Sequence, residues 1–96
     1  MNEKGETVGK GNLKLQTAQV LSNVERALEA VGAKLENVVK WTVYIVAGQN
    51  PQEGVAVFSE KLQNKPNPPA ITAVFVAGLG SPEWLVEIEA VAVIPE

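Results

Sequence analysis

The sequence has no cysteine, no histidine and no aspartate, and its 96 residues include one arginine, Arg26. Without cysteine there are no disulfides. Without cysteine and histidine there is no zinc site of the Cys/His kind and no Ser-His-Asp or Cys-His catalytic arrangement. EF-hand calcium loops, which need aspartate or asparagine at fixed offsets, are excluded as well. We therefore expect neither a metal ion nor a cofactor.

Positive charge and long apolar runs are also scarce. Eight basic residues stand against eleven acidic ones, so the net charge is −3. A nucleic-acid-binding protein needs clustered lysine and arginine to displace counterions. No run approaches the roughly 18 apolar residues of a membrane span, and the polar start lacks the apolar core of a signal peptide. We expect a soluble, cytoplasmic protein that binds neither membranes nor nucleic acid.

The chain is nevertheless apolar for its size, with 46% hydrophobic residues. Its length predicts a single domain over residues 1–96. A domain this small buries only about 60–70% of the surface that its unfolded chain exposes, so it needs further support. Because disulfides and metals are excluded, we expect the excess apolar surface to lie against other subunits.

Helical spacing of valine, alanine and leucine predicts an amphipathic helix over residues 13–31, capped by Asn12 and ended by Gly32. Residues 38–47 are rich in β-branched and aromatic side chains and predict a strand. Alternation places four of its residues on one face and four on the other. The first group is Val39, Trp41, Val43 and Ile45; the second is Lys40, Thr42, Tyr44 and Val46.

A second helix begins at Asn50-Pro51, with an apolar stripe of Val55, Phe58 and Leu62, and the proline-rich residues 64–69 must end it. Residues 70–77 and 84–94 predict two strands joined as an antiparallel hairpin through the turn-rich residues 78–82. Residues 1–11 predict a loop or a short edge strand around Thr7–Val8. The order is (β)-α-β-α-β-β, with a parallel, right-handed crossover before the hairpin. This is an α+β fold with two helices on one face of a mixed sheet.

Two carboxylates on the last strand are candidates for acid–base chemistry. Glu87 and Glu89 are two residues apart, so both project from one strand face, roughly 7 Å apart. Apolar neighbours on that face would raise their pKa values, as in many acid–base catalysts. The alternative is a water-exposed sheet face on which each glutamate pairs with a lysine. Lys40 and Tyr44 share one face of the first long strand, where they either donate to a ligand or to Glu87, or are simply solvated.

Several segments resemble the YjgF/YER057c/UK114 family, also called the reactive-intermediate deaminases (RidA). The resemblance spans nearly the whole chain, and its most specific part is the closing V-E-I-E-A-V-A run. It implies a chorismate-mutase-like α+β fold, a homotrimer, and small-molecule clefts between subunits. The segments are Gln16-Thr17, residues 38–44, residues 58–60, Pro69-Ala70 and residues 85–92.

The resemblance also implies roles for individual residues. Glu87 takes the place of the glutamate that positions the attacking water. Ile71 stands where active members carry the arginine that binds the substrate carboxylate, and Val55 stands in place of an asparagine in the cleft. Thr72 and Ala73 follow Ile71 and can present backbone and hydroxyl groups to a ligand, with Tyr44 nearby. The family's first strand has no counterpart, either because this sequence starts late or because that wall of the cleft has been lost.

Three functions follow from the resemblance. The first is hydrolysis of enamines or imines to 2-oxo acids and ammonia through Glu87, without the usual arginine. The second is ligand binding without catalysis, in an apolar pocket lined by Ile71 and Val55. The third is the endoribonuclease or translation-inhibitor role of the family's older labels, which the charge balance disfavours.

Overall fold

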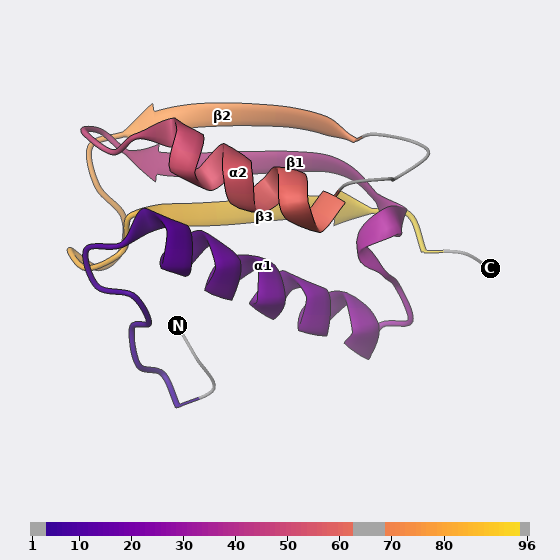
Figure 1. The fold of residues 1–96 in the computed structure, drawn as a ribbon. Helices are drawn as coiled ribbons and strands as arrows, with labels where there is room; N and C mark the ends of the chain where they lie inside the picture. Colours follow the sequence, from indigo (N-terminus) through magenta and orange to yellow (C-terminus); the bar gives the residue numbers. More distant parts are fainter. Residues whose placement is uncertain (1–3, 63–68, 95–96) are drawn as a thin grey trace.

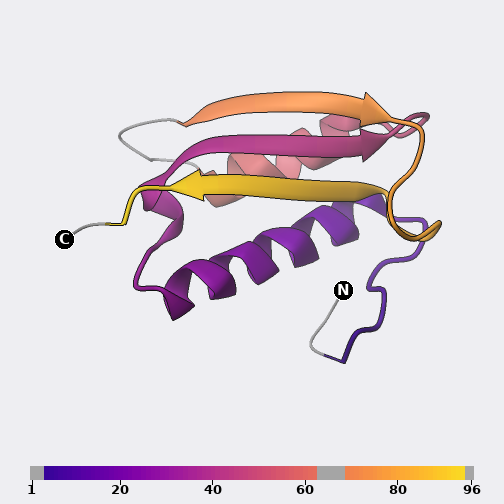
Figure 2. The same ribbon diagram turned by 180° about the vertical axis from the view of Figure 1, so that it is seen from behind.

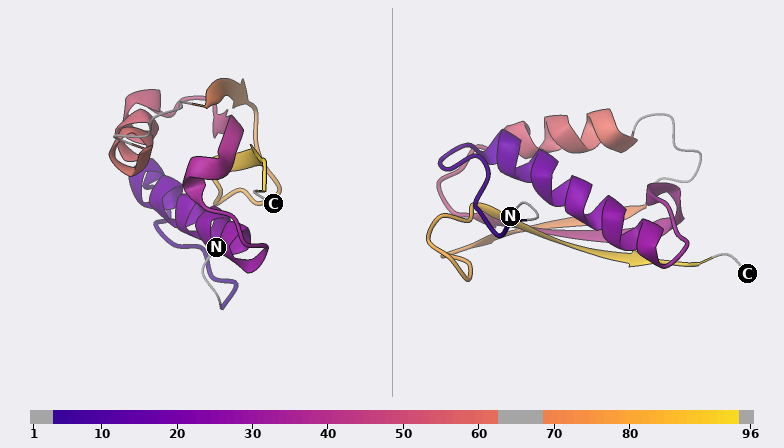
Figure 3. Two further views of the ribbon diagram at one scale, coloured as in Figure 1. Left: turned by 90° about the vertical axis from the view of Figure 1, so that its right-hand side faces the viewer. Right: turned by 90° about the horizontal axis from the view of Figure 1, so that it is seen from below.

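The computed structural model describes residues 4–62 and 69–94 of the chain. Two helices cover one face of a three-stranded mixed sheet (Figure 1), and the other face of the sheet carries no helix (Figures 2 and 3). This confirms the predicted α+β fold with both helices on one face. The elements are α1 (Leu13–Ala30), a short 3₁₀ turn η1 (Leu35–Asn37), β1 (Val38–Val46), α2 (Pro51–Leu62), β2 (Ala70–Val76) and β3 (Val86–Ala92).

The sheet has the order β2-β1-β3, with β1 in the centre. As predicted, β1 and β2 are parallel, because α2 crosses between them. The predicted hairpin is wrong: β3 pairs antiparallel with β1, not with β2. Residues 77–85 carry the chain past the end of β1, where Ala47 N donates to Val76 O at 2.8 Å and Val46 N donates to Leu85 O at 2.9 Å. Pairing on both edges satisfies the backbone of the most buried strand.

Both helices begin as the sequence predicts. Asn12 caps α1 by accepting a hydrogen bond from Leu15 N at 3.0 Å, and Gly32 follows the helix with φ +81°. Asn50 accepts from Gln52 N at 3.0 Å, directly before Pro51 opens α2. The described part of α2 ends at Leu62, and the prolines that were expected to end it at residues 66–68 lie outside the described residues.

The faces of β1 follow the predicted alternation except at its start. Trp41, Val43 and Ile45 are buried under the helices, but Val39 is 48% exposed and Val38 is buried in its place. The register explains this, because Val38 pairs with Ala92 while Lys40 pairs with Val91. A β-bulge at Val39 therefore inserts one residue and reverses the alternation before Lys40.

The core is centred on Trp41, which is fully buried and meets the ring of Phe58 edge-on at 5.4 Å between ring centroids. The predicted stripe of α2 is partly wrong. Val57 and Phe58 are buried, whereas Val55 is 51% exposed, because α2 packs on its Gly54–Phe58 side. Residues 4–12 form a loop rather than an edge strand. No helix in the described ranges has the length and apolar character needed to cross a membrane.

Candidate functional site

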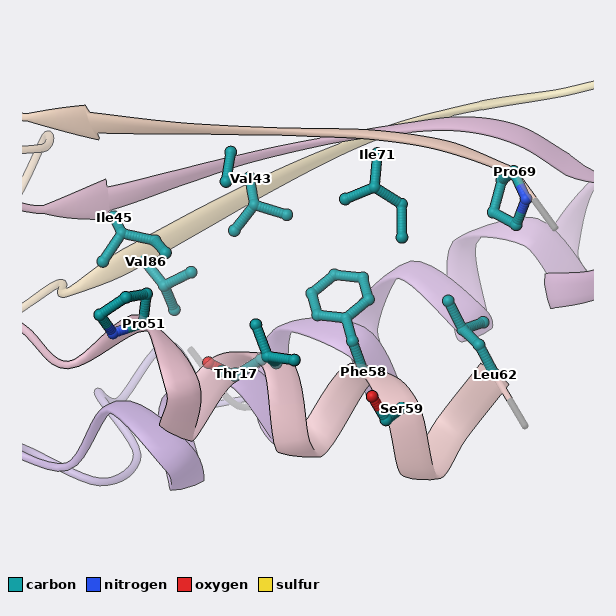
Figure 4. Close-up of a pocket in the computed structure, with 13 residues that line it drawn as sticks. Thr17, Val43, Ile45, Pro51, Phe58, Ser59, Leu62, Pro69, Ile71 and Val86 are labelled. Atoms are coloured by element: carbon teal, nitrogen blue, oxygen red, sulfur yellow. The ribbon is translucent and has the colours of Figure 1, made fainter.

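A cavity of about 410 Å³ lies between α2 and the sheet (Figure 4). The Phe58 ring projects from α2 toward the side chain of Ile71 on β2, and Leu62 and Pro69 lie at one end (Figure 4). Thr17 and Ser59 contribute the polar side-chain atoms of the lining. The thirteen lining residues are Thr17, Val43, Ile45, Pro51, Gly54, Val55, Phe58, Ser59, Leu62, Pro69, Ile71, Ala73 and Val86.

Small side chains on two elements leave this space open. Gly54 in α2 has no side chain, and a Cβ built there would lie 3.7 Å from Thr17 Oγ1. On the sheet, Ala73 pairs with Val43 and also fills little volume. Ile71 and Val55 are each about half exposed, so they face the cavity from β2 and α2 without closing it.

The face of the sheet away from the helices holds a polar cluster of Tyr44, Glu87 and Glu89. Tyr44 pairs with Glu87 in the strand register, but its hydroxyl donates to Glu89 Oε1 at 2.5 Å. This hydrogen bond to Glu89 is the main cause that raises the pKa of Tyr44 above its ordinary value of 10.0, with smaller contributions from desolvation and from the charges of Glu89 and Glu87. Neither glutamate forms an ion pair with a lysine in the described part of the chain, contrary to the alternative considered from the sequence.

Glu87 also borders a smaller cavity of about 160 Å³ at the free edge of β3. Thr7 and Val8 of the N-terminal loop and Gln19 of α1 form the other walls. Glu87 is exposed, and no hydrogen bond to its carboxylate occurs within residues 4–62 and 69–94. Its carboxylate oxygens are therefore available to water or to a ligand.

The structure divides the six candidate site residues into two groups of three on opposite faces of the sheet. Alternation and register assign the five strand residues to their faces, since paired residues project to the same side, and Val55 lies on the helix side because it belongs to α2. The cavity group is Ile71, Ala73 and Val55; the open-face group is Glu87, Tyr44 and Thr72. The two groups do not meet within one chain.

The sequence alone indicated no role for two buried polar residues of α1, Gln16 and Thr17. Gln16 is 5% exposed; its amide donates to Glu83 O at 2.9 Å and Gly9 O at 3.2 Å, while its oxygen accepts from Leu85 N at 2.8 Å. Thr17 donates to Leu13 O at 2.8 Å and lines the cavity between α2 and the sheet. Helical spacing could have predicted their burial, because Gln16 and Thr17 lie one turn before Val20 and Leu21 and therefore share the apolar face of α1.

No group of three or more acidic side chains in the described ranges is placed to hold a metal ion. The groups that can take part in chemistry or binding are the exposed carboxylate of Glu87, the phenol of Tyr44 bonded to Glu89, and the apolar cavity between α2 and the sheet.

Comparison with known proteins points to one family. The sequence model described as Endoribonuclease L-PSP matches residues 1–94. A RutC family protein of Pyrococcus horikoshii is 41% identical over 88 residues, which cover 92% of this chain and 67% of that protein. A RutC family protein of Synechocystis is 38% identical over 88 residues, which cover 92% of this chain and 66% of that protein. The match thus spans about two thirds of the relatives' own length.

Solved structures agree with the sequence relatives. RidA from an Antarctic Psychrobacter species superposes with a TM-score of 0.84 at 34% identity, covering 96% of this chain and 71% of that chain. A Mycobacterium tuberculosis member of the YjgF/YER057c/UK114 family gives a TM-score of 0.83 at 31% identity, covering 91% of this chain and 71% of that chain.

Proposed function

Because this chain belongs to the YjgF/YER057c/UK114 family, the Endoribonuclease L-PSP family of the matching model, we propose that it hydrolyses an enamine or imine in clefts between the subunits of a homotrimer. Glu87 holds the attacking water. An enamine first tautomerises to the imine. Water adds to the carbon of the C=N bond and one of its protons passes to the nitrogen, which gives a carbinolamine. The hydroxyl proton of the carbinolamine then passes to the nitrogen, and ammonia leaves as the C=O bond forms. We place this activity in the cytoplasm.

The observation that carries the proposal is the division of the candidate residues between two sheet faces. Glu87 lies on the open face, while Ile71 and Val55 face the cavity beneath α2. One chain cannot bring both groups to one ligand. A second copy that lays its own cavity edge against the open face would unite them, which supports a cleft between copies.

The surroundings of Glu87 suit the role of holding water. The carboxylate is exposed, and the neighbouring Tyr44 hydroxyl is engaged by Glu89, so it does not compete for Glu87. An ionised carboxylate has only acceptor sites and can take a proton from a bound water. Tyr44 and Thr72 border the same face and can contribute hydroxyl groups to the ligand.

The test is hydrolysis of an uncharged imine and of an anionic 2-imino acid generated in situ, with the wild type, Ile71→Arg and Glu87→Gln assayed side by side. If Glu87 holds the water, Glu87→Gln lowers turnover by two orders of magnitude or so, within the range that general acid–base groups contribute. Ile71→Arg should raise turnover of this anionic substrate, since a guanidinium binds a carboxylate in a bidentate manner. Equal turnover in the wild type and Glu87→Gln would exclude the catalytic role.

Binding without catalysis is the second candidate, and the apolar character of the cavity favours it. Ile71 and Val55 offer hydrocarbon to a ligand and no group that can move a proton. Saturable binding of a small molecule by a protein that does not accelerate imine loss would support this function over the first.

A role on RNA, the third candidate, has less support. The net charge of −3 and the two exposed glutamates on the open sheet face oppose binding to a polyanion. If this protein retained more RNA at low salt than a neutral control protein, that result would support a role on RNA.

A further inference from the structure

We infer that the cavity between α2 and β2 binds the apolar body of an uncharged small molecule and excludes carboxylates. This inference rests on the proposed function in one respect, because it takes the cavity as a wall of the same cleft. It adds the chemical class of the ligand.

The lining carries no charge. Its thirteen residues include no acidic and no basic side chain, and the Thr17 hydroxyl is already bonded to Leu13 O. A carboxylate placed here would lose part of its hydration and meet a lining that is mostly hydrocarbon and offers no positive charge. Burying an unpaired charge is far more costly than burying a neutral amide or hydroxyl.

Two further lining residues are hydrocarbon as well. Ile71 on β2 and Val55 on α2 are each about half exposed, so they meet an entering ligand before the buried Phe58 does. The one arginine of the sequence, Arg26, is on α1, where its guanidinium bonds to Asn23 Oδ1. It does not line the cavity.

The size and shape of the cavity further limit the class of ligand that it can bind. A volume of about 410 Å³ is within the range of small-molecule sites. The Phe58 ring stands opposite Ile71 (Figure 4), and both offer hydrocarbon surface to an apolar ring bound in the cavity. Ser59 supplies a hydroxyl group to the lining, enough to pair with one neutral polar group such as an amide or a carbonyl.

The experiment compares two probes of nearly equal shape, cyclohexanecarboxamide and cyclohexanecarboxylate, by calorimetric titration at pH 7. The amide should bind saturably to the wild type, and the carboxylate at least tenfold more weakly. Ile71→Arg should reverse this preference. Ala73→Leu, which fills the cavity, should weaken the amide at least tenfold. The matched control Ala30→Leu, exposed at the end of α1, should not change its affinity.

Equal affinity for the two probes, no binding of either probe, or an unchanged amide affinity in Ala73→Leu would each overturn the inference. The same samples are assayed for hydrolysis of an uncharged imine, because a 2-imino acid carries the carboxylate that the cavity is inferred to exclude. This assay separates the two proposals. If the amide binds but no imine is hydrolysed, the ligand class stands and catalysis fails. If imine is hydrolysed while the amide neither binds nor inhibits, catalysis stands and the ligand class fails.

Discussion

The hydroxyl of Tyr44 bonds to Glu89 rather than to Glu87, although Glu87 is its partner in the strand register. The long phenol reaches diagonally across the pair of strands to the next residue on the same face. The diagonal bond leaves the carboxylate of Glu87 without a hydrogen-bond partner among residues 4–62 and 69–94. One residue of the acidic pair is thereby held by the protein, and the other stays available for chemistry.

This bond predicts the alkaline titration of Tyr44. As the only tyrosine of the chain, it can be followed through its phenolate absorbance. The wild type should titrate above the ordinary pKa of 10.0, and Glu89→Ala should lower the pKa toward that value because it removes the main cause of the shift. Glu87→Ala, which removes a smaller contribution, should lower it less.

The raised pKa of Tyr44 also determines how the free energy of unfolding changes with pH. The folded state favours the neutral phenol, so this stabilisation is fully present below the unfolded pKa and is lost as the pH rises through the folded pKa. Urea unfolding of the wild type and Glu89→Ala should therefore differ less above this window than at neutral pH. Identical titrations of the two proteins would show that the bond does not form in solution.

Gln16 should contribute far more to the free energy of unfolding than Gln19, a partly exposed residue on the same helix. Replacing it with leucine leaves Leu85 N and the carbonyls of Gly9 and Glu83 without their partner. We expect Gln16→Leu to lower the free energy of unfolding by about 1–3 kcal/mol, measured by urea denaturation. Gln19→Leu is the control, because Gln19 is partly exposed and its side chain bonds, among the described residues, to Asn23 alone, within α1. A similar loss in both variants would contradict the role of Gln16.

Two glycines should respond in opposite ways to alanine. Gly54 lies inside α2 and has room for a Cβ, so Gly54→Ala should raise the free energy of unfolding by about 0.5–1 kcal/mol. Gly32 has φ +81°, where a side chain is strained, and Gly32→Ala should lower it by about 1 kcal/mol. Thermal unfolding of both variants checks the pair, and a destabilised Gly54→Ala would mean that α2 packs more tightly on Thr17 than described.

The open sheet face should be the surface that holds the copies together. Val74 lies there, paired with Tyr44, and is 40% exposed. Sedimentation of Val74→Lys should give a mass near that of one 10.2 kDa chain, while the wild type sediments near three times this mass. Val31→Lys, exposed at the end of α1, should assemble like the wild type. A wild type of one chain would remove the proposed cleft.

Rules for neighbouring residues were enough to predict the helices and strands from the sequence. Asn12, Gly32 and Asn50-Pro51 mark helix ends through backbone hydrogen bonds to near neighbours, and the alternation around Trp41 marks a half-buried strand. The parallel pairing of β1 with β2 followed as well, because a helix between two strands permits it. The helix ends and the strand pattern depend on contacts only a few residues apart. The pairing of β1 with β2 joins residues far apart in the sequence, such as Lys40 and Ala70, and follows instead from the crossover rule.

The sequence by itself thus determined the two helices and the three strands, the buried Trp41, and the fact that Glu87 and Glu89 share a face, but not the 3₁₀ turn η1. Only the tertiary structure decided that β3 pairs with β1 rather than β2, that Val39 forms a bulge, and that Glu87 and Ile71 lie on opposite sides of the sheet. The reason is physical. A period of two residues tells which side chains share a face, but which face the helices cover and which edge each strand takes are settled by packing between distant segments.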